Sequence, residues 1–171
     1  VIWASWFGGN GRDEPNANIR VDRDGFVYIT IVTSSTDLPT NTGAYAENFI
    51  GGTSDLYVGK FSQDGSQLLR GTYFGSSDDD YFETHPTAID RAGNVFLGFS
   101  TASTTIQASP GAYETPNRGA IEMIALKLTP DFQLAAQSSV GGGSTDSIDG
   151  ISVDAHGRVR NTGITTSTHH V

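Results

Sequence analysis

The chain has 171 residues, of which 17 % are charged, with 21 glycines, no cysteine and a net charge of −9. The acidic balance argues against nucleic-acid binding, which needs clustered Lys and Arg, and a chain without cysteine can form neither disulfides nor thiolate metal sites. No apolar run approaches the roughly 20 residues of a membrane helix. Abundant Gly, Ser and Thr with scattered aromatic residues favour an all-β protein.

Strand-like runs separated by turn residues follow one another from the N-terminus. Residues 2–7 form the first run, and four more follow before residue 75. A tight turn at Gly25, where glycine can take a positive φ, separates the first two of these four. A long loop rich in Ser, Thr and Pro precedes the third, and a turn around Gly65 precedes the fourth. The four runs are residues 18–22, 26–33, 56–62 and 68–74.

The same order of strands and turns returns later in the chain. Lys60 and Lys127 lie 67 residues apart, and Gly25, Gly93 and Gly157 mark the same turn at intervals of 68 and 64 residues. Agreement between independent anchors indicates an internal repeat. The second set of runs is 87–90, 94–101, 122–129 and 134–140, and half of a third set follows near 150–163.

Tandem four-stranded units of this kind predict sheets that stack on one another. Short loops favour antiparallel up-and-down order, and a single four-stranded sheet cannot cover both of its faces, so it needs neighbours. We therefore predict an all-β fold of tandem four-stranded antiparallel blades, forming a β-propeller or propeller-like array that is incomplete in this chain. The predicted units are the last strand of a preceding blade (1–8), two blade repeats (9–75 and 76–142) and the first half of a further blade (143–171).

Two stretches carry a resemblance to a known family. "VDRDGFVYITIVTSSTDLPTNTGAY" (21–45) and "DLYVGKFSQDGSQLLRGTYFGSSDDD" (55–80) closely resemble the SBBP repeat, which is named for seven-bladed β-propellers, and "TGITTST" (162–168) is similar to it too. Phe132 stands where the turn glycine is expected, and Arg160 and Asn161 replace an apolar pair. The resemblance implies a propeller-type fold in a secreted or cell-surface protein, with no established catalytic residues to carry over.

Two and a half blades do not close a ring, because propellers need about four or more. The sequence also lacks a start Met and a signal peptide, so we expect a processed piece or a fragment. Three readings stay open: part of a longer propeller, a subunit that closes a ring with its copies, or a subunit of an open filament. The expected partners are copies of the chain or the rest of a longer chain, bound through open strand edges, with no nucleic acid and no membrane span.

Carboxylates gather in the loop "GSSDDDYFETHP" and recur in the equivalent loops. They predict a Ca²⁺ site, since calcium takes six to eight oxygen ligands, and the candidate ligands are Asp78, Asp79, Asp80 and Glu83. A solvated turn explains the same residues without a metal. His85 and Glu83 are two residues apart and would share one face of a strand, as a zinc or acid–base site requires, but no third ligand is identifiable.

The aromatic residues are predicted to serve packing. Strand alternation would place Trp3 and Trp6 on opposite faces, with at least one of them buried between blades. Tyr45 and Tyr113 recur in the long loop and are expected to pin it onto its blade.

The leading functional hypothesis is a non-catalytic extracellular repeat protein that acts as a structural scaffold or binding module, or as a subunit of a self-assembling surface structure or filament. The alternative is a propeller hydrolase or lyase acting on extracellular polysaccharide. An enzyme would need Glu83, His85 and the carboxylates at 78–80 to converge on one cleft; a scaffold would leave them dispersed in solvent.

Overall fold

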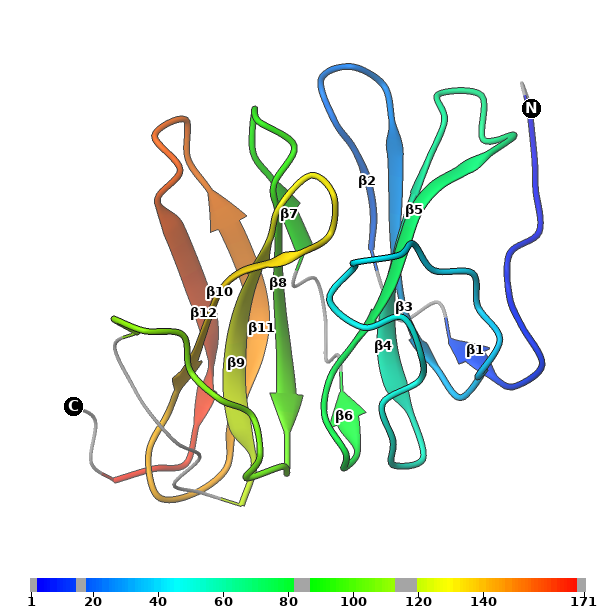
Figure 1. Cartoon of the computed structure of the whole chain (residues 1–171). Coiled ribbons are helices and arrows are strands. Elements are labelled where there is room, and N and C mark those ends of the chain that lie inside the picture. The colour runs from blue at the N-terminus through cyan, green and yellow to red at the C-terminus, as the bar shows by residue number, and fades with distance from the viewer. Residues whose placement is uncertain (1–2, 15–17, 82–86, 113–119, 169–171) are drawn as a thin grey trace.

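The computed structural model describes residues 3–14, 18–81, 87–112 and 120–168. Every regular element in these ranges is a β-strand, and all strand pairs within the sheets are antiparallel (Figure 1). The prediction of an all-β protein is therefore confirmed. No helix capable of crossing a membrane occurs in these ranges.

The first sheet has five strands in the order β1-β3-β4-β5, with β2 also paired to β3. Because β1 and β2 pair with opposite ends of β3, together they occupy the position of one edge strand. The sheet is thus an up-and-down antiparallel unit. Its strands are β1 (Asp13–Glu14), β2 (Ile19–Val21), β3 (Val27–Thr33), β4 (Asp55–Phe61) and β5 (Leu68–Phe74).

The second sheet repeats this plan, with the order β6-β8-β9-β10 and with β7 also paired to β8. The third sheet is the hairpin β11-β12 alone. The apolar run at 122–128 forms a strand, as predicted. The strands are β6 (Asp80–Tyr81), β7 (Thr87–Ile89), β8 (Val95–Thr101), β9 (Glu122–Leu128), β10 (Leu134–Val140), β11 (Asp146–Val153) and β12 (Val159–Thr165).

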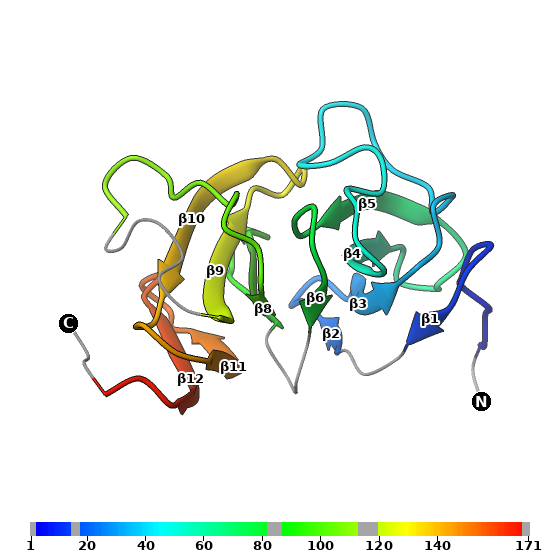
Figure 2. The same ribbon diagram turned by 90° about the horizontal axis from the view of Figure 1, so that it is seen from below.

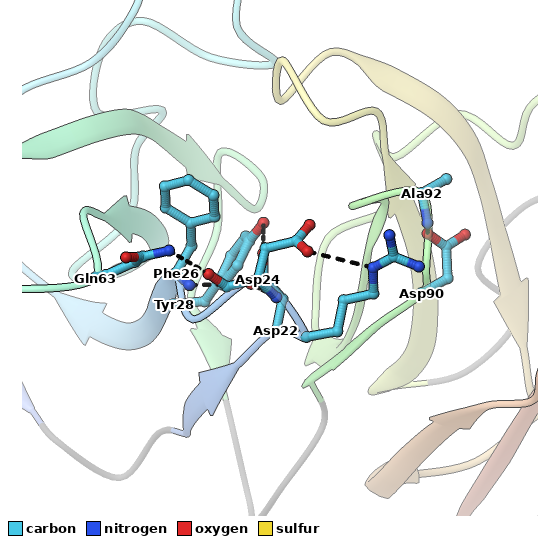
Figure 3. Close-up of polar contacts among 8 residues, drawn as sticks. Asp22, Asp24, Phe26, Tyr28, Gln63, Asp90 and Ala92 are labelled. Atoms are coloured by element: carbon cyan, nitrogen blue, oxygen red, sulfur yellow. Dashed lines mark hydrogen bonds and ion pairs between the residues drawn. The ribbon is translucent and has the colours of Figure 1, made fainter.

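The turn at Gly25, Gly93 and Gly157 has the same geometry in all three copies, which explains why similar residues recur there. In each copy an Asp Oδ1 accepts the backbone N–H groups of the residues two and four positions on, at 2.8–3.0 Å. The glycine three positions on donates its N–H to the Asp carbonyl and has a φ of 77–86°, which side chains other than glycine rarely adopt. The turns contain Asp22 and Gly25, Asp90 and Gly93, and Asp154 and Gly157; the first two appear in Figure 3.

The main core lies between the two five-stranded sheets, which stand side by side with the β11–β12 hairpin beyond the second (Figures 1 and 2). Side chains alternate along a strand, so Tyr28 and Val58 of the first sheet face Leu97 of the second, and all three are buried. Phe74 and Phe99 meet edge to face, with ring centroids 5.8 Å apart. The described residues form no closed ring, so the propeller arrangement stays a prediction.

Residues 3–8 differ from their predicted structure. They were expected to form the last strand of a preceding blade, but they have no strand assignment. Phe7 fixes this arm to the first sheet, with its ring 5.6 Å from that of Tyr57 and 5.3 Å from that of Phe61. A strand needs a neighbouring strand to satisfy its backbone groups, and the described part of the chain supplies none here.

Candidate functional site

The outer face of the first sheet, which points away from the second sheet, is apolar. Phe7 and Phe49 cover the part of it formed by Tyr57 and Tyr73, and the part beside β2 is open. Ile19 and Val21 of β2 are 67 % and 62 % exposed. They border a groove of about 320 Å³ whose other walls are Val27, Ile29 and Phe61 from the sheet and Trp3, Ser5 and Phe7 from the N-terminal arm. Contiguous exposed apolar surface of this kind marks sites of interaction in soluble proteins.

The equivalent face of the second sheet shows what such a surface packs against. Val27 pairs with Phe61 in the first sheet, and Val95 pairs with Leu128 at the same point of the second. Both members of the second pair are fully buried, because the first sheet covers them. Each sheet therefore meets the next through two different faces, which is the geometry of a head-to-tail interface.

The two tryptophans do not follow their prediction. Trp3 is 45 % exposed and Trp6 is fully exposed, so neither is buried between sheets. The ring of Trp3 lies against Gly65 in the β4–β5 turn, where a Cβ would collide with it. Alternation predicted one buried tryptophan only on the assumption that the arm is a strand.

The outer edge of the first sheet is covered by its own chain. The N–H of Tyr73 in β5 donates to the carbonyl of Ala46, at 3.2 Å, and the N–H of Asn41 donates to the carbonyl of Gly71, at 3.1 Å. Coverage by a loop is one way in which natural sheets prevent edge pairing. The predicted route of association through open strand edges is therefore blocked here.

The second sheet protects its outer edge in the same way. Ser109 donates its N–H to the carbonyl of Gln137 in β10 at 2.8 Å, and its hydroxyl accepts the Gln137 N–H at 2.9 Å. The Gln137 side chain also donates to the carbonyl of Gln107. β10 is therefore covered at Gln137, whereas β12 pairs with β11 alone in the described part of the chain, so association through open strand edges stays a prediction.

Phe132 joins the two sheets. It stands at the glycine position of its turn, has a φ of 62° and is fully buried. Its ring packs 6.5 Å from that of Tyr28, and its carbonyl accepts the N–H of Tyr45 at 2.7 Å. Burial of an aromatic ring offsets a left-handed backbone that costs roughly 1–2 kcal/mol. Tyr45 thus ties its loop to the second sheet as well as to its own, and Tyr113 lies outside the described residues.

The acidic loop does not gather its carboxylates around one point. Asp78 is exposed, whereas Asp79 accepts hydrogen bonds from the Thr53 N–H and hydroxyl at 2.8 and 2.7 Å. Asp80 is fully buried. Glu83 and His85 lie outside the described residues. Within those ranges no group of three or more acidic or histidine side chains could hold a metal ion, so we identify no metal ligands and the Ca²⁺ site stays a prediction.

Asp80 belongs to a hydrogen-bonding arrangement that recurs in each repeat and that was not predicted from the sequence. Asp13, Asp80 and Asp146 begin equivalent strands, and Oδ2 of each accepts the backbone N–H of the residue four positions earlier, at 2.6–2.8 Å. Hydroxyl groups at or just beyond the end of the paired strand complete the set: Thr33 at the end of β3 donates to Asp13 at 2.6 Å, and Ser167, two residues after β12, donates to Asp146 at 3.1 Å. The 67- and 66-residue spacing of the three aspartates was the available signal.

Two buried carboxyl groups at the junction of the sheets have perturbed acidity. Burial raises the pKa of Asp55 to about 7, and the charge of Asp80 adds to the effect. Burial also raises the pKa of Asp80 to about 6, against hydrogen bonds from Thr101 and Ser76 that lower it. Burial in a medium of low polarity disfavours the charged form of an acid.

The turns after β2 and β7 lie side by side and bring two aspartates and two arginines together (Figure 3). Narrow clefts of about 180 and 100 Å³ there are lined by Asp22, Arg23, Asp90 and Arg91, among others. Asp22 and Asp90 are committed to their own turns as acceptors of backbone N–H groups. Their carboxylates therefore act as structural acceptors.

A larger cleft, of about 450 Å³, opens on the far face of the second sheet beside the β11–β12 hairpin. Its walls include Phe96, Ala125, Ala136, Val140 and Val159, and Lys127 is the one titratable side chain among its lining residues. The Lys127 ammonium lies 5.3 Å from the centre of the Phe96 ring, an ordinary cation–π contact. The described residues that line the cleft include no acid–base pair.

The amino-acid sequence gives no match to protein-family models and no significant match to curated proteins. The resemblance to the SBBP repeat therefore stays a prediction that depends on the quoted stretches.

Proposed function

We propose that this protein is a non-catalytic repeat scaffold or binding module whose four-stranded units stack through their faces in a propeller-like array. The observation that carries the proposal is the open apolar face of the first sheet, because the equivalent face of the second sheet is buried against a repeat unit. A scaffold of this design uses rigid strand ladders as support and presents its loops to partners.

The proposed partner of the open face is a further repeat sheet, supplied by a copy of the chain or by more of the same chain. Head-to-tail contacts between unlike faces either close into a ring or continue as a filament, so a self-assembling surface structure is the expected setting. The placement outside the cell comes from the SBBP resemblance alone. Support for a non-catalytic role comes from the different settings of the three aspartates: Asp78 is exposed, Asp79 accepts hydrogen bonds from Thr53, and Asp80 is buried.

The size of the native particle tests the proposal. Light scattering and electron microscopy of the 171-residue chain should detect concentration-dependent assemblies larger than the 18.1 kDa monomer. Val21→Asp places a charge on the open face, where burying it would be costly, and should return the protein to the monomer. Because Val21 is 62 % exposed in the single chain, the variant should keep its fold and its far-UV spectrum.

Leu134→Asp is the matched control, since Leu134 is also an exposed apolar strand residue, at 43 %, but belongs to the second sheet. It should leave the particle size unchanged. A wild-type chain that stays monomeric at high concentration, with a solubility that Val21→Asp does not alter, would contradict an interacting role for this face.

A further inference from the structure

Two buried carboxyl groups meet where the first sheet passes into the second. Asp55 begins β4, Asp80 begins β6, and both are fully buried. Gly75 lies between them: a Cβ at this residue would collide with Asp80 Oδ2 and would lie 3.3 Å from Asp55 Oδ1. The two carboxyl groups therefore share one small volume, which the missing side chain of Gly75 leaves open.

The hydrogen bonds around the pair are unequal. Asp80 accepts from the Ser76 N–H at 2.6 Å and from the Ser76 hydroxyl at 3.1 Å, with Thr101 as a further donor. Asp55 Oδ2 accepts the N–H of Ile50, and the N–H of Gly51 is a further donor to this carboxyl group, but the buried Asp55 Oδ1 has no hydrogen-bond partner. A buried polar atom without a partner is costly, and Asp55 Oδ1 is the atom that a proton would satisfy.

The next junction along the chain repeats the arrangement. Glu122 begins β9 and Asp146 begins β11, 67 and 66 residues after their counterparts, and both are buried. A Cβ at Gly141 would collide with Glu122 Oε1 and would lie 2.6 Å from Asp146 Oδ2. Two carboxyl groups facing one glycine at two successive junctions are a property of the repeat.

We propose that the junction between repeat sheets is a proton-binding site, in which Asp55 is protonated at Oδ1 and donates a hydrogen bond to the Asp80 carboxylate; Glu122 and Asp146 form the corresponding pair. The proton links the start of β4 to the start of β6. Its loss leaves two like charges in a buried site, which weakens the contact between the sheets.

The surroundings of the pair favour the bound proton. The charged group outside the pair that acts on it is the Asp78 carboxylate from the preceding loop, which raises the pKa of Asp80. The nearby phenols of Tyr45 and Tyr73 are neutral, and the carboxylates of the pair raise their pKa values further. No Lys or Arg is among the groups acting on the pair in the part of the chain that the structure describes. The raised pKa values of Asp55 and Asp80, about 7 and about 6, agree with this geometry.

The sign of the pH effect follows from the direction of these shifts. The folded state holds its proton up to a higher pH than the unfolded chain, whose ordinary aspartate pKa is 3.8. The bound proton therefore makes its full contribution to the free energy of unfolding below about pH 4, and this contribution is lost as the pH rises through about 6 to 7.

Thermal melts of the wild-type chain and of Asp55→Asn, followed at several pH values, test the proposal. Between about pH 4.5 and about pH 8 the wild-type melting temperature should fall by roughly 5–10 °C. Asp55→Asn should lose about half of that fall, because the amide N–H₂ donates to Asp80 at every pH while the pair of Glu122 and Asp146 keeps its own proton. Asp154→Asn is the control with the same change of charge, in an exposed turn, and it should melt with the wild-type pH dependence.

A fall that persists unchanged in Asp55→Asn would overturn the proposal. If that variant does not fold, infrared spectroscopy of the wild-type chain decides instead. At about pH 5.5 a buried protonated acid should give a carboxylic C=O band that is about half lost near pH 7 and absent above about pH 8. A spectrum with carboxylate bands alone at about pH 5.5 would equally overturn the proposal.

Discussion

Strands β8 and β12 occupy the same place in successive repeats, yet all seven residues of β8 are buried and all seven of β12 are exposed. Both follow the same Asp-to-Gly turn, and both begin with valine, Val95 and Val159. The neighbours differ, because β8 lies between β7 and β9 with the first sheet over one face, whereas among the described residues β12 pairs only with β11. The Asp-to-Gly turn therefore specifies a hairpin, and the burial of the strand that follows it depends on the neighbouring strands and sheets.

The residues of β8 and β12 differ in the same sense as their burial, since β8 is the more apolar of the two strands. Leu97 and Phe99 of β8 face the first sheet, and their counterparts in β12 are Asn161 and Gly163. Arg160 and Asn161, which depart from the apolar pattern of the repeat, thus lie on a strand that is exposed in this chain. The first junction is a packed core, and the second is half open.

Substitution of Phe132 should cause the largest fall in the free energy of unfolding, because its ring fills the first junction. The described part of the second junction has an open cleft at the equivalent place. Phe132→Ala should cost about 3–5 kcal/mol of unfolding free energy, the usual loss for a buried aromatic ring. Phe132→Gly should cost roughly 1 kcal/mol less, since glycine accepts the φ of 62° without strain. Urea denaturation measures both, and equal stability of the two variants would mean that the backbone is not strained.

Val95→Ala and Val159→Ala compare the two strands at one repeat position with one substitution. Val95 is fully buried and Val159 is 40 % exposed, so the expected losses are about 2 kcal/mol and below about 0.5 kcal/mol. The change in strand propensity is common to both and cancels in the difference. Denaturant titration of the pair checks this, and a large loss for Val159→Ala would show that β12 is covered in solution.

Much of the local structure could be predicted from the sequence. The runs of β-branched and aromatic residues gave the main strands, and Gly25, Gly93 and Gly157 located the turns because their positive φ has a direct chemical signature. The repeat spacing also predicted equivalent strands in successive units. These features depend on interactions within a few residues.

The contacts between units could not be predicted in the same way. Asp13, Asp80 and Asp146 were read as loop carboxylates, because only the packed structure brings backbone N–H groups and hydroxyl groups to them. Phe132 was read as a departure from the pattern, although it fills the space between two sheets. Exposure of Trp6 and coverage of the β5 edge likewise depend on partners distant in the chain, and periodicity carries no information about these.

The ion pair between Arg70 and Asp131 should give the smallest effect, although it also crosses the first junction. The two groups are 3.1 Å apart with side chains 42 % and 70 % exposed, and exposed pairs contribute about 0.2–1 kcal/mol. Arg70→Gln should therefore lower the unfolding free energy by about 0.5 kcal/mol, and the loss should vanish near 1 M salt, where screening acts within about 3 Å. Arg158→Gln is the control, since Arg158 pairs with Asp154 inside a single turn. If Arg70→Gln cost as much as Val95→Ala at any salt concentration, charge rather than apolar packing would hold the closed junction together, and the contrast between β8 and β12 would need an electrostatic explanation.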